Sequence, residues 1–328
     1  MKILVTGSAG HLGEALMRTL ATAKHEAVGL DIKPSPFTHY VGSIADRTFV
    51  DLCMRGVQGI LHTATLHKPH IQTHSAQEFV DTNISGTLNL LEAAVAARAE
   101  VFVFTSTTST FGRALMPAEG QPATTWITEE VVPIPKNIYG VTKLAAENLC
   151  ELAHRKDGLP CIILRTSRFF PEDDDDRATR GGYDNDNLKV NEFLHRRVDL
   201  ADAVTAHLAA ITKAPMLGFD RFIVSATTPF TPQDLTELRT QAPLVARRCC
   251  PDYEPEYLRR GWSAPDSIDR VYVNQRARLL LGWQPKYDFH YAVQQLRAGQ
   301  DYGSALARAV GSKGYHARSF AEGPYPVG

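Results

Sequence analysis

Short apolar runs alternate with longer amphipathic segments through the first half of the chain. Residues 2–6 (KILVT) and 101–106 (VFVFTS) lack helical spacing, which is typical of strands buried on both faces of a parallel sheet. The segments 79–98 and 139–156 repeat apolar residues every three to four positions and predict helices. Further strands are expected at 27–30, 58–63 and 161–164, and a further helix at 14–23. This alternation predicts an α/β fold, with a doubly wound parallel sheet covered by helices on both faces.

The alternation ends after Arg165. Residues 171–187 are polar and contain an acidic run from Glu172 to Asp176, so we expect a solvated surface loop or lid there. Consecutive carboxylates have no defined ligand geometry, and a cation site in this run is the less favoured alternative. The segments 199–212 and 221–225 then predict a helix and a strand.

The C-terminal part of the chain has a different composition. Residues 229–282 predict short elements rich in Pro, Arg and Tyr, which suits a smaller substrate-facing subdomain. The tail 311–328 is rich in Gly and Pro, and we expect it to be loosely held unless a partner subunit pins it. We therefore predict two domains: residues 1–170, and residues 171–328, from which 199–225 return to the sheet.

Charge and cysteine content narrow the class of protein. The 328 residues carry 35 Lys and Arg against 36 Asp and Glu, a net charge of −1, which gives no electrostatic case for nucleic acid or a membrane surface. No apolar stretch approaches the length of a membrane span, and the N-terminus is itself a predicted core strand, which argues against a signal peptide. The five cysteines are odd in number and have no metal-ligand spacing. We expect a reduced, cytoplasmic protein.

Three glycines follow the first predicted strand and precede a predicted helix. Gly7 permits a tight turn, Gly10 lets the backbone approach a pyrophosphate, and Gly13 lets the helix pack close to the strand. The helix N-terminus offers free N–H groups and a positive dipole end to phosphates. The spacing is GxxGxxG, with His11 and Leu12 inside it, and the alternative is a glycine-rich loop without a ligand. Strand, loop and helix in this order predict a Rossmann-type dinucleotide site.

Asp31 ends the second predicted strand, eighteen residues after Gly13. A carboxylate there can accept hydrogen bonds from both ribose hydroxyls and would repel a 2′-phosphate, which favours NAD over NADP. Lys33 lies two residues further on and weakens this discrimination. The alternative is that Asp31 only initiates the turn before Pro34 and Pro36.

Tyr139 and Lys143 lie four residues apart, on one face of a predicted helix. A phenol normally titrates near pH 10, and a nearby ammonium lowers its pKa by favouring the phenolate. Such a pair can move a proton to or from an alcohol, which is the half of a hydride transfer that a nicotinamide cannot perform alone. Without the glycine loop this pair would be a weak motif, because Tyr and Lys are common on exposed helices.

Histidines cluster after the strand at 58–63. His67, His70 and His74 have ligand-like spacing, but Pro69 interrupts any helix there, and we predict no metal site. Since the loop follows the carboxyl end of a strand, His67 is a candidate substrate contact, and a solvated loop is the alternative. Arg196, Arg197, Arg259 and Arg260 are equally consistent with binding an anionic substrate and with surface positions.

With these motifs together, the chain resembles the extended short-chain dehydrogenases/reductases, and within them the NAD-dependent epimerase/dehydratase family. The resemblance covers residues 1 to about 289 and is most specific in the first 170. It implies cofactor contacts from Gly7, Gly10, His11, Leu12, Gly13 and Asp31, from Ser43 and Ile44, from Thr63, Ala64 and Thr65, and from Asn83, Tyr139 and Lys143.

The resemblance also implies catalytic and substrate residues. Aligning residues 104–112 with the family's FSSSxxxYG segment places the catalytic hydroxyl at Thr107, with Ser106 and Thr108 as open alternatives. Arg168 stands where the family usually has an Asn that helps to hold a sugar nucleotide, and it can pair with a phosphate or carboxylate. Thr107, Thr108, His67 and Arg168 are the candidate substrate contacts. The LGWxP segment at 281–285 is expected to serve packing.

The resemblance implies an NAD-dependent epimerase/dehydratase-type enzyme acting on a hydroxyl-bearing or keto carbon, most simply that of a nucleotide sugar. Two alternatives stay open: a dehydrogenase or reductase of a small molecule without a nucleotide, and a non-catalytic NAD-binding regulatory protein. The motifs do not separate epimerase from net dehydrogenase. The resemblance further implies a homodimer formed through the helices at 79–98 and 139–156.

Overall fold

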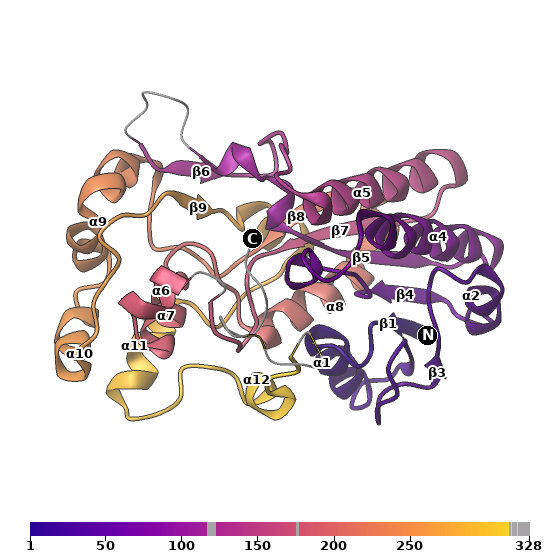
Figure 1. Cartoon of the computed structure of the whole chain (residues 1–328), viewed down its shortest axis with the longest axis horizontal. Helices are drawn as coiled ribbons and strands as arrows, with labels where there is room; N and C mark the ends of the chain where they lie inside the picture. The colour runs from indigo at the N-terminus through magenta and orange to yellow at the C-terminus, as the bar shows by residue number, and fades with distance from the viewer. Residues whose placement is uncertain (117–122, 175–176, 315, 317–319, 321–328) are drawn as a thin grey trace.

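A seven-stranded parallel sheet forms the centre of the protein (Figure 1). The computed structural model describes residues 1–116, 123–174, 177–314, 316 and 320. The strand order is β3-β2-β1-β4-β5-β7-β8, and every neighbouring pair is parallel. This confirms the predicted doubly wound α/β fold. The strands are β1 (Lys2–Thr6), β2 (Glu26–Asp31), β3 (Tyr40–Val41), β4 (Gly59–His62), β5 (Val101–Thr107), β7 (Cys161–Thr166) and β8 (Phe219–Val224).

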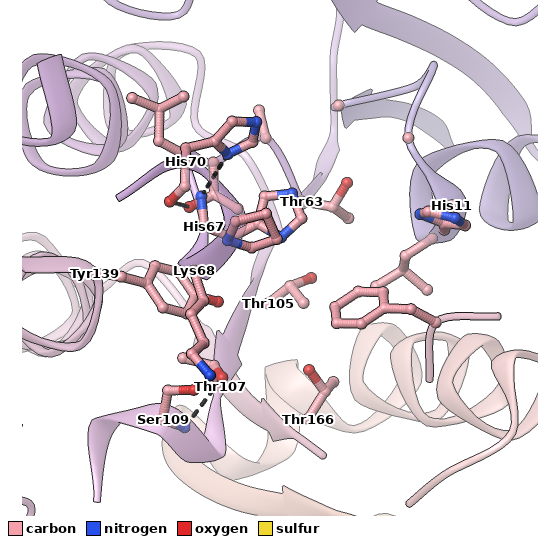
Figure 2. A pocket seen from close by; sticks show the side chains of 18 of the residues that line it. His11, Thr63, His67, Lys68, His70, Thr105, Thr107, Ser109, Tyr139 and Thr166 are labelled. Atoms are coloured by element: carbon pink, nitrogen blue, oxygen red, sulfur yellow. Dashed lines mark hydrogen bonds between the residues drawn. The ribbon is translucent and has the colours of Figure 1, made fainter. Parts of the chain in front are cut away.

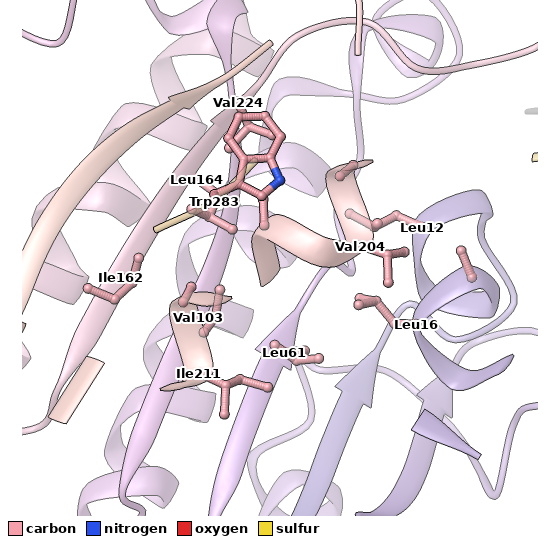
Figure 3. Close-up of a cluster of buried hydrophobic side chains, with 14 of the residues drawn as sticks. Leu12, Leu16, Leu61, Val103, Ile162, Leu164, Val204, Ile211, Val224 and Trp283 are labelled. Carbon is pink, nitrogen blue, oxygen red and sulfur yellow. The ribbon is translucent and has the colours of Figure 1, made fainter. Parts of the chain in front are cut away.

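Helices cover both faces of this sheet, because alternate strand residues point in opposite directions. Ile3 and Val5 of β1 pack with α1 (His11–Leu20) and α8 (Leu200–Leu217) in one buried cluster (Figure 3). Leu4 points the other way, into a cluster with α2 (Arg47–Cys53), α4 (Gly86–Ala96) and α5 (Ile138–Asp157). Both faces are apolar, as the continuous apolar runs predict.

Trp283 of the LGWxP segment is buried against α8 in the first of these clusters (Figure 3). Its indole Nε1 donates hydrogen bonds to the Asp202 carbonyl oxygen at 3.1 Å and to Thr205 Oγ1 at 3.0 Å. The expected packing role of this segment is therefore observed.

The helix predicted at 79–98 is divided in three. It begins as α3 (Ala76–Phe79), continues as a π-helical stretch (Val80–Ser85) and ends as α4. Ser75 and Glu78 form a capping box that fixes its start. Periodicity alone does not reveal a π-helical stretch, which is a local widening of the helix that often marks a functional position. Asn83 lies in this stretch.

A second, mainly helical part lies beside the sheet, at the left in Figure 1. Its core joins residues of the helices α7, α9, α10 and α11, with Phe193, Val245 and Phe289 among the buried side chains. The short parallel pair β6 (Thr125–Ile127) and β9 (Arg270–Tyr272) lies at its junction with the sheet. The helices are α6 (Arg177–Gly182), α7 (Asn185–Glu192), α9 (Leu235–Cys249), α10 (Tyr253–Arg260), α11 (Phe289–Arg297) and α12 (Ala305–Val310).

Two expectations for loops were wrong where the structure describes them. The region 171–187 contains α6 and the start of α7, and the side chains of Glu172 and Asp174 are only 6% and 5% exposed. Glu172 lies 2.8 Å from His11 Nε2, and Asp174 forms an ion pair with Arg168. Asp175 and Asp176 of the acidic run lie outside the described residues. The tail is also not loose at its beginning, since Ser312, Lys313 and Gly314 pack against the body of the protein. Within the described residues, no helix has the length and apolar character needed to cross a bilayer.

Candidate functional site

A cavity of about 950 Å³ lies at the carboxyl edge of the sheet, where β1, β2, β4, β5 and β7 end. Most residues that the sequence proposed for the site line this cavity. They are Gly7, Gly10, His11, Leu12, Gly13, Asp31, Ser43, Ile44, Thr63, Ala64, Thr65, His67, Thr107, Thr108, Tyr139 and Arg168. Asn83 and Lys143 were proposed as well, but they lie behind the lining residues. Several of the lining side chains are labelled in Figure 2.

The glycine loop is packed too tightly for side chains. Gly7 has φ +74°, and a Cβ there would lie 2.8 Å from the Ala64 nitrogen. A Cβ on Gly13 would lie 1.9 Å from the Gly7 carbonyl oxygen, so only glycine lets α1 start this close to β1. Gly10 caps α1 without any side-chain hydrogen bond, which leaves the N–H groups of the first turn available. This cradle fits the pyrophosphate of a dinucleotide.

Asp31 lies at the end of β2, next to the glycine loop. Its Oδ2 accepts a hydrogen bond from Ala9 N at 3.0 Å, and its Oδ1 accepts one from Lys33 N at 2.9 Å. The two backbone donors hold the carboxylate at the cavity wall, and each oxygen keeps a further lone pair. A ribose diol can use these lone pairs, whereas a 2′-phosphate would meet a negative charge. The chain's own residues therefore fit NAD.

Tyr139 and Thr107 meet at the opposite wall of the cavity. Tyr139 is in the first turn of α5, whose N-cap Asn137 accepts a hydrogen bond from Gly140 N at 3.0 Å. Burial raises the pKa of Tyr139 to about 12, and a hydrogen bond with the Thr107 side chain acts in the opposite direction. Ser109 N donates to Thr107 Oγ1 at 3.1 Å (Figure 2), which leaves the Thr107 hydroxyl proton free to point at the phenol oxygen.

The other hydroxyls of this segment differ in their surroundings. Ser106 also lines the cavity, but its Oγ donates its proton to the buried Glu147 at 2.5 Å. Thr108 lines the cavity, but Thr107 is the hydroxyl that contacts Tyr139. Among these three hydroxyls, Thr107 is the one that acts on the pKa of Tyr139, and its catalytic role stays a prediction.

Lys143 lies one turn below Tyr139 and is 2% exposed. Its Nζ donates to the Thr105 carbonyl oxygen at 2.6 Å and lies 3.9 Å from the centre of the Phe104 ring. Burial lowers the pKa of Lys143 to about 7, and the charge of Glu147 opposes this shift. Burial thus shifts both groups toward neutrality. The phenol pKa lies above its ordinary value, contrary to the expectation that Lys143 would lower it.

Asn83 holds a neighbouring segment instead of lining the cavity. Its Oδ1 accepts hydrogen bonds from Leu66 N at 2.8 Å and Thr65 Oγ1 at 2.9 Å. Its Nδ2 donates to the Leu66 carbonyl oxygen at 2.8 Å and to Thr142 Oγ1 at 3.0 Å. The amide is fully used by these four bonds. These bonds tie the segment after β4 to the helix that carries Tyr139, and the cofactor contact of Asn83 stays a prediction.

His67 is the histidine that faces Tyr139. The two ring centres lie 6.5 Å apart, and Figure 2 shows His67 between His70 and the phenol. His67 N donates to His70 Nδ1 at 3.1 Å, and His70 N donates to the His67 carbonyl oxygen at 2.8 Å, so each residue fixes the other. Burial lowers the pKa of His67 well below its ordinary value and keeps the ring neutral. Among the residues described, no three His, Cys, Asp or Glu side chains are arranged to hold a metal.

Arg168 lines the cavity, but carboxylates surround it. It forms an ion pair with Asp174 and lies 3.8 Å from the buried Glu192. Glu192 also pairs with Arg196 at 3.0 Å and with Arg197 at 2.7 Å. Burial raises the pKa of Glu192, but the three arginines outweigh it and hold that pKa at about 2. Arg259 and Arg260, by contrast, pair with Glu256 on α10 and do not line the cavity.

The sequence missed several lining residues. Phe170 packs with His67, their ring centres 5.9 Å apart, and Arg270 and Tyr272 reach the cavity from β9. Lys313 and Gly314 line it from the C-terminal tail. An aromatic residue after β7 was a usable signal, but nothing in a Gly- and Pro-rich tail indicated that it returns to the site.

Comparison with known proteins agrees with this geometry. The model of the NAD dependent epimerase/dehydratase family matches residues 3–216. A UDP-glucose 4-epimerase of Rhizobium meliloti is 29% identical over 323 residues, covering 87% of this chain and 93% of that enzyme. The protein y4nG of Sinorhizobium fredii is 32% identical over 170 residues, which are 49% of this chain and 39% of that protein.

Solved structures share the fold. A short-chain dehydrogenase/reductase superfamily protein of Agrobacterium tumefaciens with bound NAD has a TM-score of 0.63 at 21% identity, covering 91% of this chain and 98% of that one. A UDP-glucuronic acid 4-epimerase of Bacillus cereus, in complex with UDP-glucuronic acid and NAD, also has a TM-score of 0.63, at 20% identity, covering 94% and 100%. The resemblance carried by the glycine loop, Tyr139 and Lys143 is confirmed, and the chain belongs to the NAD dependent epimerase/dehydratase family, with NAD as its cofactor.

Proposed function

We propose that this protein interconverts epimers of a nucleotide sugar at a hydroxyl-bearing carbon. The observation that carries the proposal is that Tyr139 and Thr107 line the same cavity as the glycine loop. One cavity then accommodates the hydride carrier and the proton carrier side by side. Relatives named UDP-glucose 4-epimerase that cover most of this chain support a uridine diphosphate sugar as substrate.

Each wall of the cavity has a distinct task in this proposal. Gly7, Gly10 and Gly13 admit the pyrophosphate, and Asp31 accepts the adenosine ribose hydroxyls. Ser43, Ile44, Thr63, Ala64 and Thr65 complete the cofactor wall, together with His11 and Leu12. Bound NAD supplies a hydride acceptor, and its positively charged nicotinamide favours the phenolate of Tyr139.

The residues of the chain then move the proton. Tyr139 takes the proton of the substrate hydroxyl, and Thr107 donates a hydrogen bond to the same oxygen. Lys143 backs the phenol from one turn below, where its charge compensates the phenolate. When the sugar turns over in the cavity, Tyr139 returns the proton to the oxygen on the carbon of inverted configuration. Thr108 and His67 are the further substrate contacts that we propose, with His67 as a neutral imidazole.

A dehydrogenase or reductase of a substrate without a nucleotide is the second candidate. Arg168 favours it, because this arginine pairs with Asp174 at the position where the family usually offers an amide to a sugar nucleotide. In this reading the second part of the chain, residues 171–328 without 199–225, still forms the substrate side. A non-catalytic NAD-binding protein is the weaker third candidate, because such a protein has no use for the contact between Tyr139 and Thr107.

We further propose a cytoplasmic homodimer. The helices α4 and α5 expose the apolar side chains of Leu88, Val141 and Leu152, which are 39%, 49% and 48% exposed. Apolar side chains left on adjacent helices support an interface with a second copy. Light scattering should give twice the chain mass, and a monomer mass would contradict this proposal.

The decisive experiment compares ligand classes and then turnover. The purified protein is screened by thermal shift against nucleotide sugars, sugar acids, lactones and hydroxysteroids in the presence of NAD. UDP-glucose is then incubated without any added oxidant, and the configuration of its sugar carbons is followed by proton NMR. Stabilisation by a nucleotide sugar and redox-neutral inversion support the epimerase. Net NADH formation with a substrate that lacks a nucleotide would support the second candidate instead.

A further inference from the structure

The described part of the C-terminal tail crosses the cofactor cavity. After α12 the chain turns at Gly311, which has φ +62°, and Gly314 repeats this left-handed conformation. Lys313 and Gly314 line the same cavity as Gly10 and His11, which begin α1. We call Ser312, Lys313, Gly314 and His316 the C-terminal strap.

A buried carboxylate from a distant segment binds the strap. Glu172 Oε1 accepts hydrogen bonds from Ser312 Oγ at 2.8 Å, Lys313 N at 3.1 Å and Gly314 N at 3.3 Å. The same oxygen lies 2.8 Å from His11 Nε2, in the first turn of α1. The glycine-loop helix, the segment after β7 and the strap therefore meet at one carboxylate oxygen.

Two more contacts fasten the strap on either side of this point. Lys313 Nζ forms an ion pair with Glu14 of α1, whose side chain is 6% exposed. His316 Nε2 lies 2.9 Å from the carbonyl oxygen of Pro69, and its ring centre lies 5.4 Å from that of His70. The strap thus connects the wall of the cavity at α1 with the wall formed by the loop after β4.

We propose that the C-terminal strap is part of the cofactor site and retains the nicotinamide dinucleotide through repeated turnovers. This inference rests on the proposed function. An epimerase must return the hydride that it removes, so a cofactor that stays bound between turnovers is an advantage. Ser312 Oγ, Lys313 N and Gly314 N already donate to Glu172, and Lys313 Nζ pairs with Glu14, so the strap acts by covering the bound dinucleotide. Release of the cofactor then requires the contacts at Glu172 and Pro69 to open.

Protonation does not open this contact near neutral pH. Burial raises the pKa of Glu172, but the hydrogen bonds from His11 and Ser312 lower it to about 2. The carboxylate is therefore ionised near neutral pH. A change in the rate of cofactor release on replacing Glu172 then reflects the loss of the strap contacts, and not a change in the protonation state of Glu172.

The test measures cofactor release and not activity. The full-length protein is loaded with NADH, free nucleotide is removed, and excess NAD is added while the fluorescence of bound NADH is followed. Glu172→Ala and a chain ending at Val310 should each release NADH at least ten-fold faster than the full chain. Ser312→Ala, which removes one of the hydrogen bonds, should give a smaller acceleration of the same sign.

Matched controls separate the strap from general damage. Asp173→Ala removes a neighbouring exposed charge from the same segment, and a chain ending at Phe320 keeps every described strap residue. Both should release NADH within two-fold of the full chain. If the chain ending at Val310 does not fold, Glu172→Ala and Ser312→Ala decide the matter, each with its thermal unfolding recorded. Equal release rates for Glu172→Ala, Ser312→Ala and Asp173→Ala would overturn the proposal.

The experiments distinguish a failure of the epimerase proposal from a failure of the strap proposal. A full-length protein that binds NADH but inverts no nucleotide sugar contradicts the epimerase, and its release kinetics still judge the strap. A protein that inverts nucleotide sugars while its Glu172→Ala variant releases NADH at the unchanged rate contradicts the strap alone.

Discussion

The two ends of the cavity are built from different materials. The cofactor end consists mainly of backbone, with glycines that admit no side chain and a single carboxylate, Asp31, held by two N–H groups. The end bounded by Arg168 consists of charged side chains that pair with one another, around the buried Glu192. Backbone geometry determines the shape of the cofactor end, whereas the balance of charges determines the structure of the end around Arg168.

This difference determines how each end responds to change. A backbone cradle tolerates no added atom, because its close contacts involve main-chain atoms that cannot rotate away. A cluster of ion pairs tolerates changes in shape, but the removal of one charge leaves its partners buried and uncompensated. Tyr139 lies between the two ends. Its replacement is the most direct way to change the catalytic step without changing the residues that build either end.

The largest effect is expected for Tyr139→Phe. Loss of the phenol oxygen removes the proton carrier, so turnover should fall by about 10²- to 10⁴-fold. NADH binding should be unchanged, because the cofactor end is built by other residues. Turnover is measured by the NMR assay and binding by NADH fluorescence. Turnover within about three-fold of the wild type would remove Tyr139 from the mechanism.

Glu192→Gln should destabilise the charged end of the cavity. Three arginines lose their shared buried carboxylate, and breaking such a buried pair costs about 3–5 kcal/mol of the free energy of unfolding. The matched control is Glu254→Gln, since Glu254 lies 3.5 Å from Arg247 with both side chains about half exposed. That change should cost less than about 1 kcal/mol. Urea unfolding measures both, and equal losses would show that burial of the charges does not matter.

Gly13→Ala should break the backbone-built end. The added Cβ would meet the Gly7 carbonyl oxygen at 1.9 Å, so α1 must move away from β1. We expect a loss of about 1–3 kcal/mol in the free energy of unfolding, together with weaker NADH binding. Gly181→Ala is the control, because a Cβ there meets nothing within 4 Å. Similar effects of the two substitutions on NADH affinity would contradict the cradle.

The sequence predicted the backbone-built end far better than the charged end. Glycine spacing, an apolar strand and an acidic strand end are local patterns, and the interactions that they specify are local as well. The strand at Lys2–Thr6 and the lining positions of Gly7, Gly13 and Asp31 therefore agree with the structure.

The charged end depends on which distant residues meet. The sequence showed an acidic run and several arginines, but it did not show that Asp174 pairs with Arg168. A contact of the same long-range kind at the cofactor end, between Glu172 and Ser312 of the tail, was not shown by the sequence either. Burial is a property of the assembled fold in the same way. The pKa of Tyr139 is raised because the whole cavity wall encloses the phenol, which the spacing to Lys143 alone does not reveal.

Lys143 can be compared directly with Glu192, because each is a buried ionisable side chain, one at the end built from backbone and the other at the charged end. Glu192 is surrounded by arginines, and its pKa of about 2 means that folding favours its charged form. The Nζ of Lys143 bonds to the Thr105 carbonyl oxygen, and burial lowers its pKa to about 7, so folding disfavours its charged form. The two groups should therefore affect stability in different pH ranges.

The sign for Lys143 follows from linkage. In the unfolded chain a lysine keeps its proton up to about pH 10.4, whereas in the folded, cofactor-free protein Lys143 loses it near pH 7. Between these values the unfolded state binds one more proton, so stability should rise with pH from about 7 to about 10.4; as the pH falls through this range the gain is lost, and the loss is complete near pH 7. The contribution is about 1.4 kcal/mol per pH unit. Lys143→Met should remove it.

Urea unfolding at pH 7.5, 8.5 and 9.5 tests this prediction on the cofactor-free proteins. Contributions from most other titrating groups are common to both chains and largely cancel in the difference between them. The variant should be the more stable protein at pH 7.5, with the gap narrowing toward pH 9.5. Parallel pH profiles would mean that Lys143 stays charged in the folded state, and that the backbone around Thr105 stabilises a buried ammonium as effectively as the arginines stabilise Glu192.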